Sequence, residues 1–167
     1  MIDIYVMDED RFEKVDILGK TPKELLTDNL KDNYKTVKSI DEIEEKSEYT
    51  ALLYQDTPLV DMDFLYELCQ KGEGFRLGDG FIKRKGYKGK LKSIDDIRAI
   101  QIKKLCDIGP IFNFLREKVK EYYKDKDILF YDIDSCYIDL TVEIGEGTIV
   151  HPMVTLKGKT KIGKNCV

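Results

Sequence analysis

Hydrophobic and polar positions change their period several times along the first 92 residues. Short runs of strand length, apolar or alternating, occur at residues 2–6, 33–38, 49–55 and 81–84. Helix-like patterns lie between them, at residues 21–30 and directly after Asp61. Because strands and helices alternate, we expect residues 1–92 to form a small α/β domain.

Both expected helices begin with a recognisable signal. Thr21, Pro22 and Glu24 form a capping box with proline at the first helical position, and Asp61 can cap the second helix. The apolar faces that follow are formed by Leu25, Leu26 and Leu30 in the first helix and by Phe64, Leu65 and Leu68 in the second. These faces are predicted to cover the sheet.

The pattern changes at residue 93. Aliphatic residues at helical spacing, Ile94, Ile97, Ile100, Leu105 and Ile108, predict one helix that ends at Gly109-Pro110. A second helix is predicted to follow, with its buried side formed by Ile111, Leu115, Val119 and Tyr122. We expect residues 93–136 to consist of these two bridging helices and a short strand.

An aliphatic residue then recurs at every sixth position, at Ile138, Ile144, Val150, Leu156 and Ile162. This step is typical of short parallel strands that stack coil upon coil in a β-solenoid. An antiparallel meander would need two-residue alternation and hairpin turns such as Asn-Gly, which the segment lacks. We therefore predict an incomplete solenoid over residues 137–167.

Composition indicates an ordinary soluble chain. Its 28 basic and 32 acidic residues give a net charge of −4, which favours neither nucleic acid nor membrane as a partner. The acidic N-terminus does not resemble a signal peptide, so we expect a cytoplasmic protein. The four cysteines are widely spaced and the single histidine, His151, has no nearby ligand partner, so a zinc site is not expected.

One segment departs from this balance. Residues 83–92 carry six basic residues and Tyr87 but no acidic residue. The segment could contact phosphate or nucleic acid. Since it contains no motif that reads bases, a solvated loop is the simpler interpretation.

The tail "YIDLTVEIGEGTIVHPMVTLKGKTKIGKNCV" resembles the first coils of the bifunctional N-acetylglucosamine 1-phosphate uridyltransferase and glucosamine 1-phosphate acetyltransferase family. The preceding "FLREKVKEYYKDKDILFYDIDSCYI" is similar to that family's connecting helix and strand. The resemblance implies a reduced, Rossmann-like nucleotidyltransferase domain and the start of a left-handed parallel β-helix of hexapeptide repeats. It also implies a homotrimer and a sugar nucleotide as ligand.

The resemblance also implies candidate site residues. In "LLYQDTPLVD", Asp56 falls on the family's metal-binding aspartate, with Mg²⁺ as the cofactor, while Gln55 replaces a glycine. In "LGDGFIKR", the family's sugar-nucleotide turn is matched by Gly78, Gly80 and Arg84.

Other parts of the family's machinery have no counterpart. The glycine-rich phosphate loop that opens the family is missing, because the first glycine of this chain is Gly19. Lys103 stands where the family carries its second metal ligand, and a charged lysine cannot ligate Mg²⁺. His151 lies in an early coil and does not match the family's catalytic histidine. We therefore expect a relative whose uridyltransferase activity is lost or very weak.

Two alternatives remain open. The chain could be a non-catalytic module that trimerises through its solenoid and senses a sugar nucleotide. It could also be a fragment of a longer hexapeptide acyltransferase whose active coils lie beyond Val167.

Overall fold

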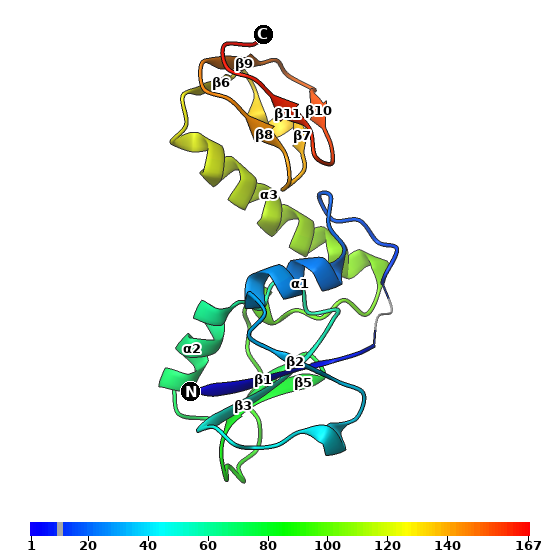
Figure 1. Cartoon of the computed structure of the whole chain (residues 1–167), viewed down its shortest axis with the longest axis vertical. Coiled ribbons are helices and arrows are strands. Elements are labelled where there is room, and N and C mark those ends of the chain that lie inside the picture. The colour runs from blue at the N-terminus through cyan, green and yellow to red at the C-terminus, as the bar shows by residue number, and fades with distance from the viewer. Residues whose placement is uncertain (10–11) are drawn as a thin grey trace. The chain divides into compact units, whose positions relative to one another are not determined.

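The computed structural model describes residues 1–9 and 12–167 and divides into two compact units. Unit 1 comprises Met1–Val15 and Thr21–Ile111, and unit 2 comprises Asp16–Lys20 and Phe112–Val167. The elements of unit 1 are β1 (Ile2–Met7), α1 (Pro22–Leu30), β2 (Lys35–Val37), β3 (Tyr49–Tyr54), α2 (Met62–Gln70), β4 (Phe75–Leu77) and β5 (Gly80–Arg84) (Figure 1). Single 3₁₀ turns lie at Ile40–Glu42, Ile97–Ala99 and Leu105–Asp107.

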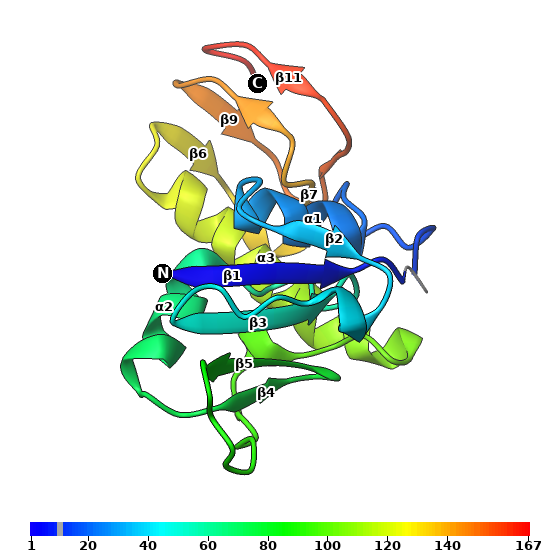
Figure 2. The same ribbon diagram turned by 60° about the horizontal axis from the view of Figure 1, so that its bottom comes forward.

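The strands of unit 1 form one mixed sheet in the order β2-β1-β3-β5-β4 (Figure 2). β1 pairs in parallel with β2 and β3, whereas β5 pairs antiparallel with β3 and β4. The mixed α/β class and the four predicted strands are confirmed. The short strand β4 was not predicted from the sequence.

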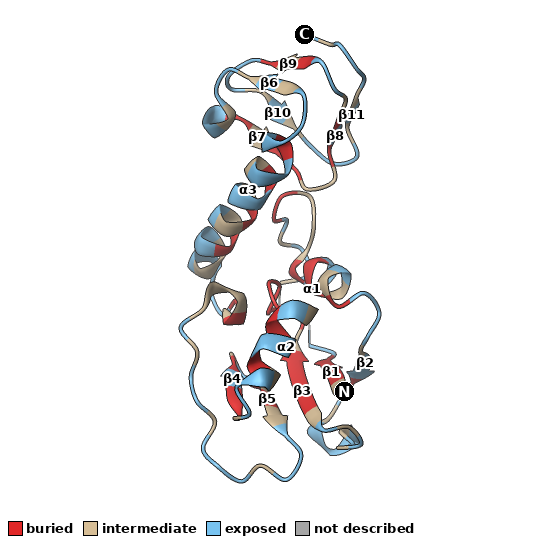
Figure 3. Cartoon of the chain, turned by 90° about the vertical axis from the view of Figure 1, so that its left-hand side faces the viewer, coloured by how far each residue is buried: buried red, intermediate tan, exposed pale blue. Residues whose placement is uncertain are grey.

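β3 lies at the centre of this sheet and is buried from Thr50 to Leu53 (Figure 3). Leu53 belongs to the main core cluster together with Leu26 of α1 and Leu65 of α2. Leu52 points into a second cluster with Tyr5 of β1. A strand with apolar contacts on both faces reads as a continuous apolar run, as "YTALLY" does.

The predicted helix starts are confirmed. The Glu24 N–H donates to Thr21 Oγ1 at 3.3 Å, and the Thr21 N–H donates to Glu24 Oε2 at 2.7 Å. At α2, the Phe64 N–H donates to Asp61 Oδ1 at 2.7 Å.

The predicted helix between Ile94 and Ile108 is wrong. This segment forms two separate 3₁₀ turns joined by extended chain. Its path is set by tertiary contacts, because the Ile102 N–H donates to the Asp56 carbonyl at 2.8 Å and Gln101 and Ile102 are buried. A helix would turn these groups away from the sheet edge.

The second bridging helix forms as α3 (Ile108–Lys124), which begins before Gly109-Pro110 rather than after them. Proline is tolerated in a first helical turn because its missing N–H has no intrahelical partner there. Ile111, Leu115 and Val119 are buried as predicted. Tyr122 is a correction: it is 61% exposed, and Tyr123, at 3% exposure, takes the buried position four residues after Val119.

Unit 2 continues with six short strands. They are β6 (Ile128–Phe130), β7 (Tyr137–Ile138), β8 (Glu143–Ile144), β9 (Thr148–Val150), β10 (Thr155–Leu156) and β11 (Lys161–Ile162). They form three parallel pairs, β6 with β9, β7 with β10 and β8 with β11. Ile138 lies beside Leu156 and Ile144 beside Ile162, so the chain returns to the same side eighteen residues later.

The aliphatic residues that recur at every sixth position point into one hydrophobic cluster. Ile138, Ile144 and Val150 are buried in one cluster with Val119 and Tyr123 of α3. The later members of the series, Leu156 and Ile162, pack against the same cluster but are only partly buried.

Unit 2 also includes the short segment Asp16–Lys20 from the first part of the sequence. Ile17 and Lys20 face each other across a tight turn in which Leu18 and Gly19 have positive φ angles of 52° and 83°. The Leu140 N–H donates to the Leu18 carbonyl at 3.0 Å. A Cβ at Gly19 would lie only 2.9 Å from Asp139 Oδ2, so glycine is required both by the turn and by this approach.

Candidate functional site

The carboxyl ends of parallel strands are the usual place for ligand groups in α/β sheets. Asp56 lies here, two residues after the end of β3, and its side chain is almost fully buried at 2% exposure. Gln101 Nε2 donates to Asp56 Oδ1 at 2.8 Å. The carboxylate is therefore bound by a side chain of its own chain.

Gln101 connects Asp56 to the turn between β4 and β5. Its Oε1 accepts the Asp79 N–H at 2.8 Å. Gly78 has a positive φ of 62°, and a Cβ at that position would lie 2.5 Å from Gln101 Oε1 and 2.6 Å from Gln101 Cβ. The space next to Gly78 is thus filled by Gln101.

Lys103 is a solvent-facing neighbour of the turn between β4 and β5. Its Nζ is 2.7 Å from Asp79 Oδ1, and both side chains are about half exposed. Asp107 accepts the backbone N–H groups of Lys103 and Lys104, and these bonds hold the pKa of the Asp107 carboxyl below its usual value. Below, Asp56, Gly78, Asp79, Gln101 and Lys103 are called the Asp56 network.

A second contact joins the ends of β1 and β3. Gln55 Nε2 donates to Asp8 Oδ1 at 3.1 Å, and Gln55 is 2% exposed. Gln55 Oε1 is buried and has no hydrogen-bond partner among the described residues. The sheet order changes direction between these two strands, the position where open α/β sheets form a ligand crevice. The buried Gln55 side chain lies at this position.

Gly80 and Arg84 lie on β5, but the structure gives them different surroundings from Asp56. A Cβ at Gly80 would lie 2.1 Å from the Leu52 carbonyl oxygen, so glycine is needed for close strand pairing. Arg84 pairs with Tyr49 at the other end of β3, and its Nη2 lies 3.2 Å from Glu48 Oε1. The structure brings Gly78 to Asp56 and leaves Arg84 apart, while ligand binding by these residues stays a prediction.

Mg²⁺ prefers an octahedral set of oxygen ligands. At this edge the Asp56 carboxylate accepts an amide of Gln101, and the Asp79 carboxylate is paired with the Lys103 ammonium. Within residues 1–9 and 12–167, no three His, Cys, Asp or Glu side chains gather closely enough to hold a metal ion. Proteins usually hold Mg²⁺ by one or two carboxylates together with substrate phosphates, and here the ion would have to displace the Gln101 amide to bind Asp56 Oδ1.

Sequence reasoning missed Gln101, which joins the two predicted motifs. It lay inside the stretch that was predicted to be a helix. The available signal was a glutamine between Ile100 and Ile102, because a polar side chain within an apolar run needs a buried partner.

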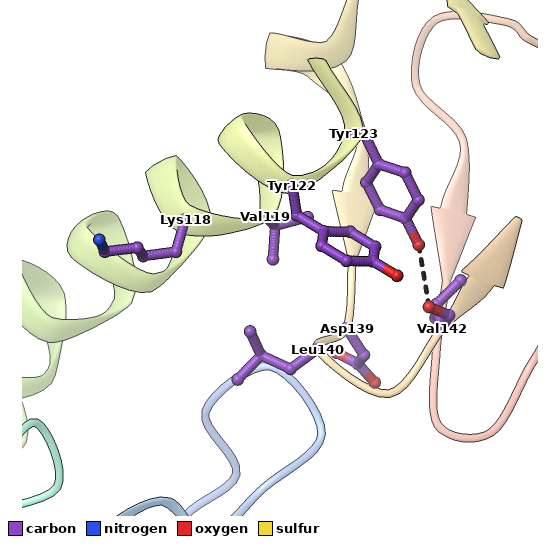
Figure 4. Close-up of a pocket in the computed structure, with 7 residues that line it drawn as sticks. All are labelled: Lys118, Val119, Tyr122, Tyr123, Asp139, Leu140 and Val142. Carbon is purple, nitrogen blue, oxygen red and sulfur yellow. Dashed lines mark hydrogen bonds between the residues drawn. The ribbon is translucent and has the colours of Figure 1, made fainter. Parts of the chain in front are cut away.

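Unit 2 contains a cavity of about 210 Å³ between α3 and the loop that joins β7 to β8 (Figure 4). Tyr123 Oη donates to the Val142 carbonyl at 2.9 Å, and burial raises the pKa of this phenol to about 12. Asp139 is 4% exposed and accepts the Gly158 N–H at 2.7 Å. The first bond joins α3 to the loop between β7 and β8, and the second joins that loop to the turn after β10.

His151 is exposed, as a corner residue would be. Its ring lies 5.3 Å from the Tyr131 ring, centroid to centroid, and forms no ion pair with the described residues. All four cysteines are free thiols. In the described part of the chain, no helix is long and apolar enough to cross a bilayer.

The chain matches no protein-family profile, but it is similar to several curated proteins. The bifunctional protein GlmU of Alkaliphilus metalliredigens is 30% identical over 89 residues, which are 52% of this chain and 19% of the relative. GlmU of Thermodesulfovibrio yellowstonii is 37% identical over 73 residues, which are 44% of this chain and 16% of the relative. GlmU of Caldanaerobacter subterraneus is 42% identical over 52 residues, which are 31% of this chain and 11% of the relative.

The matched segments cover less than a fifth of the length of each of these relatives. Identities of this size over such segments indicate common ancestry of the part that matches. Over about half of its length, the chain resembles the bifunctional GlmU proteins as a partial and diverged relative.

Proposed function

We propose that the chain is a diverged relative of the sugar-nucleotide transferases in which uridyltransferase activity is lost or very weak. The observation that carries this proposal is the state of Asp56, which is buried and hydrogen-bonded by Gln101. Gln101 also fills the space next to Gly78, where the resemblance implies a sugar nucleotide. A substrate would have to displace Gln101 to reach either residue.

The chemistry of uridyl transfer gives a second reason. Negative charge develops on the phosphoryl oxygens and needs aligned N–H groups and cations. The resemblance places a glycine-rich loop after the first strand, yet here Asp8 binds Gln55 at that edge. Lys103, which cannot ligate Mg²⁺ while it is charged, is paired with Asp79.

The proposal includes the tail as the start of a left-handed parallel β-helix. Support comes from the parallel pairs at an eighteen-residue interval and from the inward aliphatic residues, such as Ile144. Three six-residue steps per coil would give three sides.

The test is an assay with UTP, N-acetylglucosamine 1-phosphate and Mg²⁺ that detects pyrophosphate. We expect no release above background, and no rise in melting temperature with Mg²⁺ alone, because the Asp56 carboxylate is already bonded. The matched variant is Asp56→Ala. Turnover by the natural chain that this substitution abolishes would overturn the proposal.

The alternative is a non-catalytic module that trimerises or senses a sugar nucleotide. It is favoured by large apolar side chains on unit 2 that are exposed, Leu129 at 49%, Tyr131 at 60% and Met153 at 82%. Light scattering would show a trimer, and UDP-N-acetylglucosamine would raise the melting temperature. A monomer at every concentration with no thermal shift would contradict this alternative.

The third hypothesis is that the chain is a fragment of a longer hexapeptide acyltransferase. It is tested by sequencing the natural gene around the codon for Val167. Continuation of the frame into further hexapeptides would support it.

A further inference from the structure

The chain between β5 and Lys92 forms a basic loop, residues 85–92, called here the Tyr87 loop (Figure 2). Three basic residues next to it or at its end are neutralised within unit 1. Lys83 pairs with Glu45 at 2.8 Å, Arg84 with Glu48 at 3.2 Å and Lys92 with Glu73 at 2.5 Å. Lys85, Lys88 and Lys90 are exposed and form no ion pair with any described residue, although Lys85 also lies near the Glu45 carboxylate.

Tyr87 gives this loop a defined conformation. A Cβ at Gly74 would lie 2.6 Å from Tyr87 Cε1, and a Cβ at Gly89 would lie 2.4 Å from Tyr87 Oη. The ring therefore fits in a slot between two glycines. Tyr87 Oη donates to the Lys90 carbonyl at 3.2 Å, and the Lys92 N–H donates to the Gly74 carbonyl at 2.9 Å.

The tip of the loop offers backbone donors next to its lysines. The N–H groups of Lys88, Gly89 and Lys90 donate to no acceptor among residues 1–9 and 12–167. Glycine beside lysine leaves these N–H groups accessible. Ammonium groups and unpaired N–H groups that face solvent together are the groups that bind phosphate oxygens.

We propose that the Tyr87 loop binds a compact oligophosphate anion through Lys85, Lys88, Lys90 and the N–H groups at its tip. A compact anion fits better than a long polymer, because three cations lie in one short loop of a chain whose net charge is −4. The Tyr87 ring is half buried and closely approached by Gly74 and Gly89, so we assign the binding to the lysines and the N–H groups rather than to base stacking. The site therefore recognises the negative charge of the anion and not a base.

This site is separate from the Asp56 network. The loop follows Arg84, which pairs with the first residue of β3, whereas Asp56 lies two residues beyond the last residue of that strand. A chain without uridyltransferase activity can therefore still bind the anion, and each proposal can fail alone.

The experiment is a titration of the whole chain with inorganic tripolyphosphate at low salt. Binding is measured by calorimetry and by changes in amide chemical shifts. The test variant is Lys85→Gln/Lys88→Gln/Lys90→Gln. The matched control is Lys23→Gln/Lys35→Gln/Lys38→Gln, which changes three other exposed lysines and the net charge by the same amount. We expect the test variant to bind about tenfold more weakly or worse and the control to bind nearly normally.

The chemical shifts should change at Lys88, Gly89 and Lys90. UTP should bind like tripolyphosphate, which would show that no base is read, and orthophosphate should bind more weakly. Equal weakening in the two triple variants, or shifts at residues outside the loop, would overturn the proposal. Tighter, lysine-dependent binding of a single-stranded nucleic acid would also overturn it in favour of a polymer partner.

A second variant tests whether binding requires the folded conformation of the Tyr87 loop or only its three lysines. Tyr87→Leu retains all three lysines and removes the ring that fills the slot between the glycines. Since the loop would lose the ring and the hydroxyl that fix its conformation, we expect weaker binding of tripolyphosphate with an unchanged melting temperature. Unchanged binding would contradict a folded site.

Discussion

Units 1 and 2 bury the same kinds of aliphatic side chains to different extents. In unit 1, Leu26, Leu53 and Leu65 come from a helix, a strand and another helix and are all 0% exposed. In unit 2, Ile138 is 5% and Ile144 8% exposed, and Leu156 is only partly buried. A layered core closes around each side chain, whereas the short strand pairs of unit 2 bury a side chain only as far as neighbouring strands and α3 cover it.

The two units also treat buried carboxylates differently. Asp56 of unit 1 is bonded by a side chain brought from Gln101, far along the sequence. Asp139 of unit 2 is bonded by the backbone of Gly158, in the turn after β10. The bond to the buried carboxylate therefore spans 45 residues of sequence in unit 1 and 19 in unit 2.

The largest effect should come from the core of unit 1. Leu53→Ala removes a fully buried side chain from the central strand and should lower the free energy of unfolding by about 2–5 kcal/mol. Urea denaturation measures this loss. Ile40→Ala, at a site 58% exposed, is the control and should change stability little. If Leu53→Ala lowered the free energy of unfolding by less than about 1 kcal/mol, the core of unit 1 would not be as closely packed as its burial indicates.

The Asp56 network comes second. Gln101→Ala deprives Asp56 Oδ1 and the Asp79 N–H of their bonds to Gln101 and should cost about 1–3 kcal/mol in the same measurement. Gln70 is exposed, so Gln70→Ala is the matched control. If the two variants were equally stable, Gln101 would not hold the edge of the sheet together.

A smaller loss of stability is expected from matched substitutions that allow the cores of the two units to be compared directly. Ile82→Val in unit 1 and Ile144→Val in unit 2 each remove one methylene and should cost about 0.5–1.5 kcal/mol. We expect Ile144→Val to be the milder change, because its site is 8% exposed and that of Ile82 only 1%. A larger cost at Ile144 would reverse the comparison.

The smallest effect depends on pH. Burial opposes ionisation of Asp3, but hydrogen bonds from Ser47 and Lys46 outweigh it and lower the pKa of this carboxyl. Because the folded value lies below the unfolded value of about 3.9, the stabilisation is complete above that pH and is lost as the pH falls through the folded value. Melting temperatures should show this dependence and Asp3→Asn should remove it.

Asp134 of unit 2 is the comparison for Asp3. The Lys120 ammonium lowers the pKa of the Asp134 carboxyl, but this pair is exposed on the Asp134 side. Added salt should screen it, and Asp134→Asn should change the acid dependence less than Asp3→Asn. Equal effects would mean that the backbone donors around Asp3 give no advantage.

Local signals in the sequence predicted the local structure well. Thr21 and Asp61 cap their helices as expected, because a cap involves only residues within one turn. The stretch from Ile94 to Ile108 could not be predicted in this way, since its extended path depends on bonds to Asp56. The pattern predicted Tyr122 as buried in place of Tyr123, because packing against the strands of unit 2, and not the helix alone, selects which ring is buried.

The candidate site was predictable only in pieces. Asp56 and the turn at Gly78 came from motif resemblance, but their proximity follows from the sheet order β3-β5-β4. Gln101, which joins them, belongs to neither motif. A sequence pattern cannot show a contact between segments whose order in the sheet is not yet known.

The turn at Asp16–Lys20 limits how this protein can be dissected. Because unit 2 takes these residues from the first part of the sequence, the chain passes from one unit to the other more than once. A fragment that begins at Phe112 would lack Leu18, whose carbonyl receives the Leu140 N–H. Neither unit can therefore be exchanged between related proteins by a single crossover in the gene, and a chimaera must carry both of its segments from the same parent.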